Sequence, residues 1–365
     1  MNIILDNIIF ELQRAGGISK VWSKQIEQFL KQKIKFKAIE NQAASDNIFR
    51  KSLAVPANLI RQDTNYPLTL RRYMKARAPH ADIFHSSYYR TPATDVPSVV
   101  TIHDFMYEKF DKGLRQRLHR LQKENAMNHA TSIVCVSEHT RNDLLKLHPH
   151  MKTKNIFVIH NGVDEEFHVL KNKEETLSIQ GVSLTYDDYI LHVGSRGYCK
   201  NFPLEISIFA SAKNEYKNLK FVIVGGSSIS DYETSLFLKN QLSLDDVIHI
   251  PSTDNVELNI LYNHAKALTF PSRYEGFGIP ALEAIKCGCP VIAANTSSIP
   301  EVVGKEYPLL FNPESSKSMS NTVALLSNSS AVNDAIESGI IHARKFSWEN
   351  TTTKLLDAYN NTLSN

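Results

Sequence analysis

Residues 270–284 read Phe-Pro-Ser-Arg-Tyr-Glu-Gly-Phe-Gly-Ile-Pro-Ala-Leu-Glu-Ala, and this stretch predicts a ligand-binding turn between a strand and a helix. The apolar run Ala267-Leu268-Thr269-Phe270 favours a short buried strand. Gly276 and Gly278 permit backbone angles that other residues rarely adopt, and Pro280 favours the first turn of a helix running to Lys286. The first amides of such a helix lack partners within it. The turn therefore predicts a site for an anion such as a phosphate.

Two carboxylates flank this predicted anion site. Glu275 precedes the helix and Glu283 lies one turn inside it, so both can face a ligand at the helix start while touching different parts of it. Carboxylates accept hydrogen bonds from hydroxyl pairs such as those of sugars and ribose. The alternative is a glycine-rich turn with two solvated glutamates.

Glu275 and Glu283 enclose Gly276-Phe277-Gly278-Ile279-Pro280, and this arrangement resembles the Glu-x7-Glu motif of retaining GT-B glycosyltransferases of family four. The resemblance implies that Glu275 contacts the transferred sugar and that Glu283 contacts the nucleotide ribose. It also implies that Gly276, Phe277, Gly278 and Ile279 bind the donor near its sugar and diphosphate.

A second strand-turn-helix pattern lies at residues 190–203, Ile-Leu-His-Val-Gly-Ser-Arg-Gly-Tyr-Cys-Lys-Asn-Phe-Pro. Arg196 and Lys200 follow the predicted strand, and they resemble the family's Arg and Lys that neutralise the donor pyrophosphate and the leaving group. Breaking a bond from a sugar to a nucleotide diphosphate leaves extra negative charge, which fixed cations must meet. Two surface cations after a strand are the alternative.

Further loops follow predicted strand ends. Gly225 begins one of them, and the resemblance places it near the base or phosphate of the donor. Gly16 and Gly17 follow the opening strand, where the family's Gly-Gly loop faces the donor sugar; a tight turn without a ligand is the alternative. His103 resembles the family's His near the sugar 6-hydroxyl, although a lone His at a strand end is more often structural. The polar and aromatic residues 85–90 suit acceptor recognition.

The composition of the chain is that of a globular protein. Its 365 residues, 42% of them hydrophobic, suggest two domains with a core each. The apolar runs are too short to span a bilayer, and the first residues lack the basic and apolar regions of a signal peptide. Four cysteines at positions without metal-ligand spacing favour reduced thiols in a cytosol. We therefore expect a cytoplasmic protein with no structural metal.

Charge is distributed unevenly along the sequence. Residues 1–170 carry 25 Lys and Arg against 17 Asp and Glu, a net charge of +8, and the remainder carry 16 against 21, a net charge of −5. The basic half suggests an anionic partner. We expect no nucleic acid, because no recognition helix, RNA-binding motif or zinc finger is present.

A membrane surface is the other candidate for this anionic partner. One predicted helix carries Leu114, Leu118 and Leu121 on a single face, with a basic surround formed by Arg115, Arg117, Arg120 and Lys123. This pattern predicts peripheral contact with anionic lipid at the inner face of the plasma membrane. Packing of the helix on its own domain is the alternative.

Short apolar strands alternate with helical patterns in two series, which predicts parallel sheets covered by helices. The first series is 3–5, 36–39, 82–85, 99–102, 133–136 and 156–159; the second is 190–193, 221–224, 247–250, 268–270, 291–293 and 309–311. The charged segment 171–176 favours a linker between them.

The predicted fold class is thus α/β, and the arrangement is that of a GT-B enzyme. Two Rossmann-like, doubly wound domains would face a cleft: residues 1–170 bind the acceptor and residues 177–345 bind the nucleotide sugar. The resemblance implies that residues 346–365 form a final helix crossing back to the first domain.

The reaction implied by the resemblance is transfer of a hexose with retention at the anomeric carbon. The opening residues 6–10, the Gly-Gly-Ile-Ser loop and residues 194–202 resemble bacterial mannosyltransferases of O-antigen or capsule assembly, so GDP-mannose is the expected donor and a glycan or lipid-linked oligosaccharide the acceptor. No Asp-x-Asp pair occurs to hold a divalent ion, so we expect neither a metal nor another cofactor. A UDP- or dTDP-sugar donor (glucose, N-acetylglucosamine, rhamnose), a nucleotide-sugar epimerase and a non-catalytic carbohydrate-binding protein are the alternatives.

Overall fold

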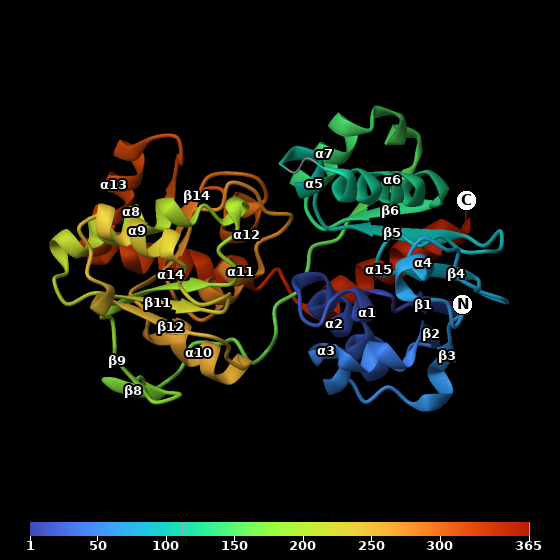
Figure 1. The fold of residues 1–365 in the computed structure, drawn as a ribbon, viewed down its shortest axis with the longest axis horizontal. Helices are drawn as coiled ribbons and strands as arrows, with labels where there is room; N and C mark the ends of the chain where they lie inside the picture. Colours follow the sequence, from blue (N-terminus) through green and yellow to red (C-terminus); the bar gives the residue numbers. More distant parts are fainter. Residues whose placement is uncertain (111–112, 365) are drawn as a thin grey trace. The chain divides into compact units, whose positions relative to one another are not determined.

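The computed structural model describes residues 1–110 and 113–364, and the chain divides into two units (Figure 1). The first unit combines Met1–Gly162 with the C-terminal segment that begins at Phe346, and the second unit is Val163–Lys345. Each unit contains a parallel sheet with helices on its faces. Within the described ranges, we find no helix with the length and apolar character needed to cross a bilayer.

The sheet of the first unit has seven parallel strands in the order β3-β2-β1-β4-β5-β6-β7. They are β1 (Ile3–Asp6), β2 (Phe36–Glu40), β3 (Ile60–Gln62), β4 (Ile83–Ser86), β5 (Ser98–Ile102), β6 (Ser132–Cys135) and β7 (Asn155–Val158). The inner strands are buried along their whole length, as expected when helices cover both faces of a parallel sheet. Successive connections leave β1 and β4 toward opposite sides, so the loops after these two strands flank a topological switch point.

The helices of the first unit connect these strands. They are α1 (Ile9–Leu12), α2 (Gly17–Lys31), η1 (Gln42–Asp46), α3 (Ile48–Ser52), η2 (Ala57–Leu59), α4 (Leu68–Arg71), α5 (Met106–Lys109), α6 (Leu114–His129), α7 (Glu138–Leu147), η3 (Pro149–Thr153) and α15 (Trp348–Ser364). Side chains of α2 that lie three or four positions apart, such as Trp22, Ile26 and Phe29, are buried in the core.

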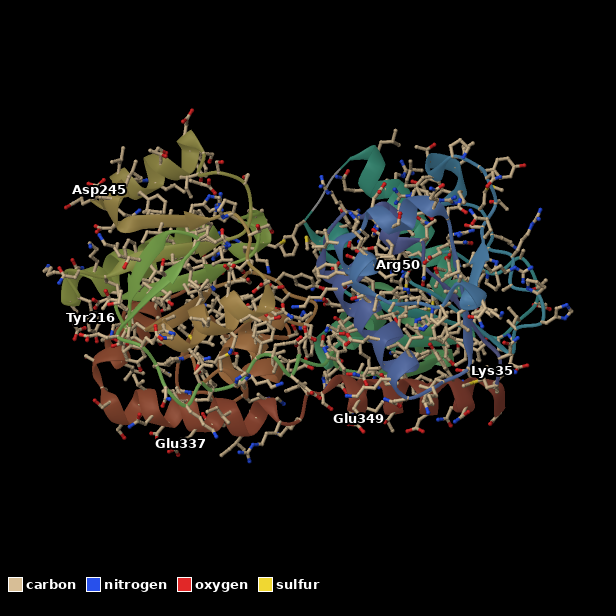
Figure 2. The ribbon with its side chains drawn as sticks, turned by 90° about the horizontal axis from the view of Figure 1, so that it is seen from below. Lys35, Arg50, Tyr216, Asp245, Glu337 and Glu349 are labelled. Carbon is tan, nitrogen blue, oxygen red and sulfur yellow. The ribbon has the colours of Figure 1, made fainter. Side chains whose placement is uncertain are left out.

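The C-terminal helix α15 completes the core of this unit. Its Leu355 and Tyr359 belong to the same hydrophobic cluster as Trp22, and Tyr359 Oη lies 2.6 Å from His85 Nδ1 on β4. Burial lowers the pKa of His85 to about 3, so this imidazole is neutral near pH 7. Figure 2 shows Glu349 on the outer side of α15, pointing to solvent. The predicted return of the last helix to the first domain is confirmed.

The chain leaves the first unit at Gly162 and returns to it at Phe346, and these two passages touch. A Cβ atom built on Gly162 would lie 2.3 Å from Trp348 N and 2.6 Å from Ser347 C, both of them backbone atoms. Only a residue without a side chain fits at this position.

The sheet of the second unit has six parallel strands in the order β12-β11-β10-β13-β14-β15. They are β10 (Tyr189–Val193), β11 (Lys220–Val224), β12 (Val247–Ile250), β13 (Ala267–Phe270), β14 (Val291–Ala294) and β15 (Leu310–Phe311), and an antiparallel hairpin of β8 (Thr176–Ile179) and β9 (Val182–Thr185) precedes them. Here the switch point lies between β10 and β13.

The helices of the second unit follow the strands in alternation. They are η4 (Tyr198–Lys200), α8 (Phe202–Glu215), α9 (Asp231–Lys239), η5 (Leu244–Asp246), α10 (Asn255–His264), α11 (Ile279–Lys286), α12 (Ile299–Val303), α13 (Ser316–Ala324), η6 (Leu325–Ser327) and α14 (Ser329–Ala343). The predicted α/β class with two doubly wound parallel sheets is confirmed, and both predicted series of strands are present.

The boundary between the two units lies between Gly162 and Val163. It is earlier in the chain than the charged segment 171–176, which the sequence favours as the linker. Two asparagines of α10 explain this difference. Asn259 Oδ1 accepts a hydrogen bond from His168 N at 3.0 Å, and Asn263 Oδ1 accepts one from Leu170 N at 2.9 Å. These bonds attach residues 168–170 to the second unit. The assignment of one domain to the acceptor and the other to the donor stays a prediction.

Candidate functional site

The loops of the second unit that carry the predicted site residues leave the carboxyl ends of neighbouring strands. Strands β10 and β13 pair in parallel, and the loops after them contain Lys200 and Glu275. Open α/β sheets bind ligands at such a switch point, because the loops on its two sides diverge there and leave a crevice.

Lys200 and Glu275 form an ion pair at this switch point. Lys200 Nζ lies 2.7 Å from Glu275 Oε1, and both side chains keep part of their surface exposed, 23% and 14%. Lys200 is the last residue of η4, and its ammonium group also lies 5.2 Å from the centre of the Phe270 ring. The structure thus brings together two residues that the sequence selects from separate motifs, and it leaves them accessible to a ligand.

The loop that carries Glu275 is fixed by the serines that follow β14. Glu275 N donates to Ser297 Oγ at 3.0 Å, and Ser298 Oγ lies 3.0 Å from the carbonyl oxygen of Glu275 and 2.8 Å from that of Phe277. Gly278 adopts φ 111° as the N-cap of α11, and no side chain caps this helix. Ser297 and Ser298 are site residues that sequence reasoning missed. Their place at the end of a strand and before a helix is the only sequence signal they offer.

Glu283 occupies a different environment from Glu275. It is only 3% exposed, and Tyr262 Oη of α10 donates to its Oε2 at 3.2 Å. The two carboxylates therefore lie on the same loop-helix segment but contact different protein groups. The prediction that they touch different parts of a ligand stays a prediction. Burial and the neighbouring Glu283 raise the pKa of Tyr262 well above its usual range, so its hydroxyl remains a donor.

Arg196 is held between two loops of the second unit. Its Nε donates to Glu233 Oε1 at 2.6 Å, and its Nη1 donates to the carbonyl oxygen of Gly225 at 3.3 Å. Gly225 and Gly226 adopt φ 84° and 72°, and a Cβ on Gly226 would lie 2.9 Å from Arg196 Nη1. Arg196 therefore joins the loops after β10 and β11, and in this structure it pairs with a carboxylate instead of standing free at the switch point with Lys200.

Glu233 is the partner of Arg196 that sequence reasoning missed. It occupies the N3 position of α9, where it also forms a capping box with Ser230. Burial acts to raise the pKa of Glu233, but hydrogen bonds from Arg196 and Ser230 outweigh it and lower that pKa. The capping-box pattern could have identified a helix start here, but nothing in it indicates the arginine.

A buried pair lies beneath the same loop. His192 Nδ1 is 2.6 Å from Glu205 Oε2, and His192 Nε2 is 3.2 Å from the carbonyl oxygen of Gly194. Burial raises the pKa of Glu205, while His192, Lys200 and Arg196 act in the opposite direction. This pair fixes the backbone from which the loop with Arg196 and Lys200 begins.

His103, Gly16 and Gly17 belong to the first unit. His103 follows β5 and is half-buried. Desolvation lowers the pKa of His103 to about 4; the charge of Lys123 also lowers it, whereas that of Asp104 raises it. The imidazole is therefore neutral near pH 7. Gly16 precedes α2, whose start has no side-chain cap, and a Cβ on Gly17 would meet nothing within 4 Å. The side chain of Gln13 accepts a hydrogen bond from Ser19 N at 3.4 Å and lies against Gly16, so of these two glycines Gly17 is the one with open space beside it.

The helix with the predicted leucine face is α6. Leu114, Leu118 and Leu121 are 75%, 45% and 54% exposed, so this face does not pack into its own unit. The predicted basic surround differs. Lys123 is buried and donates to Glu108 Oε2 at 3.0 Å and to the carbonyl oxygen of Asp104 at 2.9 Å, so it ties α6 to the segment after β5. Arg117 is exposed, Arg120 donates to the carbonyl oxygen of Tyr107, and the side chain of Arg115 lies outside the described residues.

One group of side chains in the described part of the chain could hold a metal ion. Glu124, His148 and His150 bring ligand atoms within 4.8 Å of one another in the first unit.

The four cysteines are free and buried, and burial raises the pKa of Cys135 and Cys289 to about 12. These thiols therefore remain protonated near neutral pH.

Two family models match consecutive parts of the chain. The model described as Glycosyltransferase Family 4 matches residues 16–167, and the model described as Glycosyl transferases group 1 matches residues 174–341. O-antigen chain mannosyltransferase B of Escherichia coli is 27% identical over 76% of this chain and 74% of its own length. The serotype-specific mannosyltransferase WbdA of Escherichia coli is 25% identical over 75% of this chain, which spans only 35% of that relative.

A solved structure supports the same fold. HepE from Anabaena, determined in complex with UDP, superposes with a TM-score of 0.71 at 13% identity, over 99% of this chain and 100% of HepE.

Proposed function

Since this chain belongs to the GT-B glycosyltransferases of family four, we propose that it transfers mannose from GDP-mannose, with retention at the anomeric carbon, to a glycan or lipid-linked oligosaccharide of a bacterial surface polysaccharide such as O-antigen lipopolysaccharide. The observation that carries this proposal is the accessible pair of Lys200 and Glu275 at the switch point of the second sheet. The likeness to an O-antigen mannosyltransferase supports the choice of sugar and pathway.

The proposed reaction exchanges one bond to the anomeric carbon for another on the same face. The bond from that carbon to the donor phosphate breaks and GDP leaves with the electron pair. The acceptor oxygen then bonds to the carbon, and its proton passes to the departing phosphate. Lys200, Arg196 and the uncapped amides of α11 meet the charge that develops on the diphosphate. Arg196 does so either while its guanidinium stays bonded to Glu233 or after that bond has broken.

Glu275 faces the transferred sugar in this proposal, and Glu283 binds the ribose of the nucleotide. Gly276, Phe277, Gly278, Ile279 and Gly225 line the donor site beside them. From the first unit, the neutral His103 accepts or donates one hydrogen bond near the sugar 6-hydroxyl. Gly16 and Gly17 lie at the start of α2, where Gly17 leaves open space and Gly16 lies against the side chain of Gln13.

Transfer is expected to continue in excess EDTA. The donor diphosphate would be neutralised by Lys200, Arg196 and a helix N-terminus, and the sequence contains no Asp-x-Asp pair to hold a divalent ion beside it. The measurement is the initial rate with and without chelator, after dialysis against chelator. Loss of activity that Mn²⁺ restores would show that a metal takes part.

GDP is expected to raise the melting temperature more than UDP or dTDP. A ligand that binds only the folded state at a hundred times its Kd stabilises that state by about 2.7 kcal/mol, which a thermal-shift panel resolves. GDP-mannose should then be hydrolysed slowly without an acceptor. A larger shift with UDP would instead indicate a glucosyl or N-acetylglucosaminyl donor. The UDP bound in the HepE structure favours that alternative. If no nucleotide shifts the curve, the glycosyltransferase activity itself is contradicted.

Epimerisation is the alternative reaction on this fold. An epimerase would convert its nucleotide sugar without any acceptor. Product analysis of a reaction that lacks an acceptor separates the two, because a transferase yields at most free sugar and nucleotide.

The proposed place of action is the cytoplasm, with reversible contact at the inner face of the plasma membrane. The net charge of +8 on residues 1–170 and the exposed leucines of α6 support this contact. Co-sedimentation with vesicles is expected to increase with anionic lipid, to fall with salt, and to weaken in Leu114→Ser, which removes the most exposed leucine. Binding that ignores both lipid charge and salt would contradict membrane contact.

A further inference from the structure

Three side chains that can bind a metal ion lie close together in the first unit, although they come from two segments that are distant in sequence. Glu124 belongs to α6, His148 is the residue that follows α7, and His150 belongs to η3. A ligand atom of each residue lies within 4.8 Å of the ligand atoms of the other two. All three residues are at least partly exposed, so an ion can reach them from solvent.

The spacing of Glu124 and His148 suits two ligands of one ion better than a direct contact. Glu124 Oε1 and His148 Nδ1 are 3.9 Å apart, which is too far for a hydrogen bond. Two ligands at the usual bond lengths from a tetrahedral ion are separated by roughly 3.4 Å, so a small rotation of either side chain closes the difference. Among the described residues, neither the carboxylate of Glu124 nor the ring of His148 makes a hydrogen bond that an ion would have to break.

The ring of His150 is oriented by contacts on both sides. Its Nε2 lies 3.3 Å from Oδ1 of Asn128, which is one turn after Glu124 on α6. The centre of its ring lies 6.0 Å from that of His148, and Pro149 between the two histidines restricts the backbone there. Polar contacts of this kind orient the histidine ligands of metal sites. The arrangement therefore holds both imidazoles beside the helix that carries the carboxylate.

The neighbouring lysines do not occupy the position of an ion. Lys123, next to Glu124 in sequence, donates to Glu108 Oε2 at 3.0 Å. Lys154 Nζ donates to the carbonyl oxygen of Asn128 at 2.8 Å. In the part of the chain that the structure describes, the carboxylate of Glu124 forms no ion pair with a lysine or an arginine, so its charge remains available to a cation.

The chemistry of these side chains indicates which ion they would bind. Two imidazoles and one carboxylate favour Zn²⁺ over Mg²⁺ and Ca²⁺, which prefer oxygen ligands. Three protein ligands of these types, with water at the fourth position, are a common arrangement around zinc.

We propose that Glu124, His148 and His150 bind one Zn²⁺ ion, with water as the fourth ligand, and that this ion fastens α6 to η3. The expectation of no structural metal rested on the spacing of the cysteines, and this group contains none. None of the three ligands belongs to the proposed donor site, so the expected persistence of transfer in EDTA is unchanged.

Zinc chloride is expected to bind the chelator-treated protein with one ion per chain in calorimetric titration. At a hundred times its Kd, it should raise the Tm by about 5 °C. Hydrogen exchange should slow in α6 and η3 and stay unchanged in the second unit, because the ion connects only the first two segments. If Zn²⁺ changes neither the Tm nor the exchange of α6 and η3, the group is not a metal site.

His150 and His129 provide a matched pair of variants, since both are exposed and both lie beside the end of α6. His129 Nδ1 lies 2.9 Å from a carbonyl oxygen of its own helix, and this residue is outside the proposed site. His150→Gln and Glu124→Gln are expected to weaken Zn²⁺ binding at least about tenfold, because loss of even an outer partner of a metal ligand lowers affinity by about 10- to 100-fold. His129→Gln should bind Zn²⁺ as the unchanged protein does.

Unfolding curves without Zn²⁺ show whether each variant is folded before its affinity is compared. If His129→Gln loses as much affinity as His150→Gln, Zn²⁺ binds histidines of this chain without a specific site and the proposal is wrong. These measurements use no nucleotide, so their result is independent of the proposed transferase function.

Discussion

Replacing Glu275 by glutamine is expected to abolish most sugar transfer while nucleotide binding persists. Glutamine keeps the size of the side chain but removes the charge that pairs with Lys200 at 2.7 Å and that would face the sugar as positive charge develops on it. Loss of one fixed group that stabilises a transition state typically lowers kcat by on the order of 10²–10³. Single-turnover rates with saturating donor measure the chemical step, and calorimetric titration with GDP measures binding.

Glu283→Gln is the matched variant, with the same chemical change one turn inside α11. It should weaken GDP binding by about 10- to 100-fold, the loss expected for one hydrogen bond to a charged group, and lower kcat much less. If the two variants lose nucleotide affinity equally, the division of roles between sugar and ribose is wrong.

Gly162→Ala is expected to produce the largest loss of stability from a single methyl group. The added Cβ would overlap Trp348 N and Ser347 C, and backbone atoms cannot rotate away as a side-chain end can. Overpacking of this kind costs about 3 kcal/mol, equivalent to roughly 10 °C in Tm for a domain of this size. Hydrogen exchange should show the earliest loss of protection in α15, whose first residue is Trp348.

Gly197→Ala is the control for this effect. Gly197 has φ −67°, and a Cβ there meets no atom within 4 Å. Its unfolding free energy should change by no more than about 0.5 kcal/mol. If the two variants lose the same unfolding free energy, the close contact of Gly162 with the backbone at residues 347–348 is not the cause of the loss.

The local patterns of the sequence predict the strands and the loops that follow them well. Val, Ile and Phe runs mark buried parallel strands, and Gly-rich turns mark their carboxyl ends, so the sequence alone places Lys200 and Glu275 at one sheet edge. Strand β3 could not be predicted in this way, because it has only three residues and is largely exposed. The hairpin β8-β9 could not be predicted either, because its polar, half-exposed strands have the sequence pattern of a loop.

Contacts between distant segments could not be predicted in the same way. Glu233 reaches Arg196 from α9, and Ser297 and Ser298 reach the Glu275 loop from the next strand end; each depends on how helices pack on the sheet, not on local pattern. A cavity lined by Tyr73, Tyr88 and Tyr107 is likewise assembled from several separate segments of the first unit. The roles assigned to Glu275, Glu283, Arg196 and Lys200 in catalysis stay predictions.

The return of α15 to the first unit also has a consequence for biosynthesis. Residues 1–162 emerge from the ribosome first, but Leu355 and Tyr359, which close their core, are translated only after the whole of the second unit. The second unit is continuous in sequence and needs no later segment to complete its sheet. During translation, the earlier half of the chain therefore keeps an apolar surface beside Trp22 and His85 uncovered while the later half can already close.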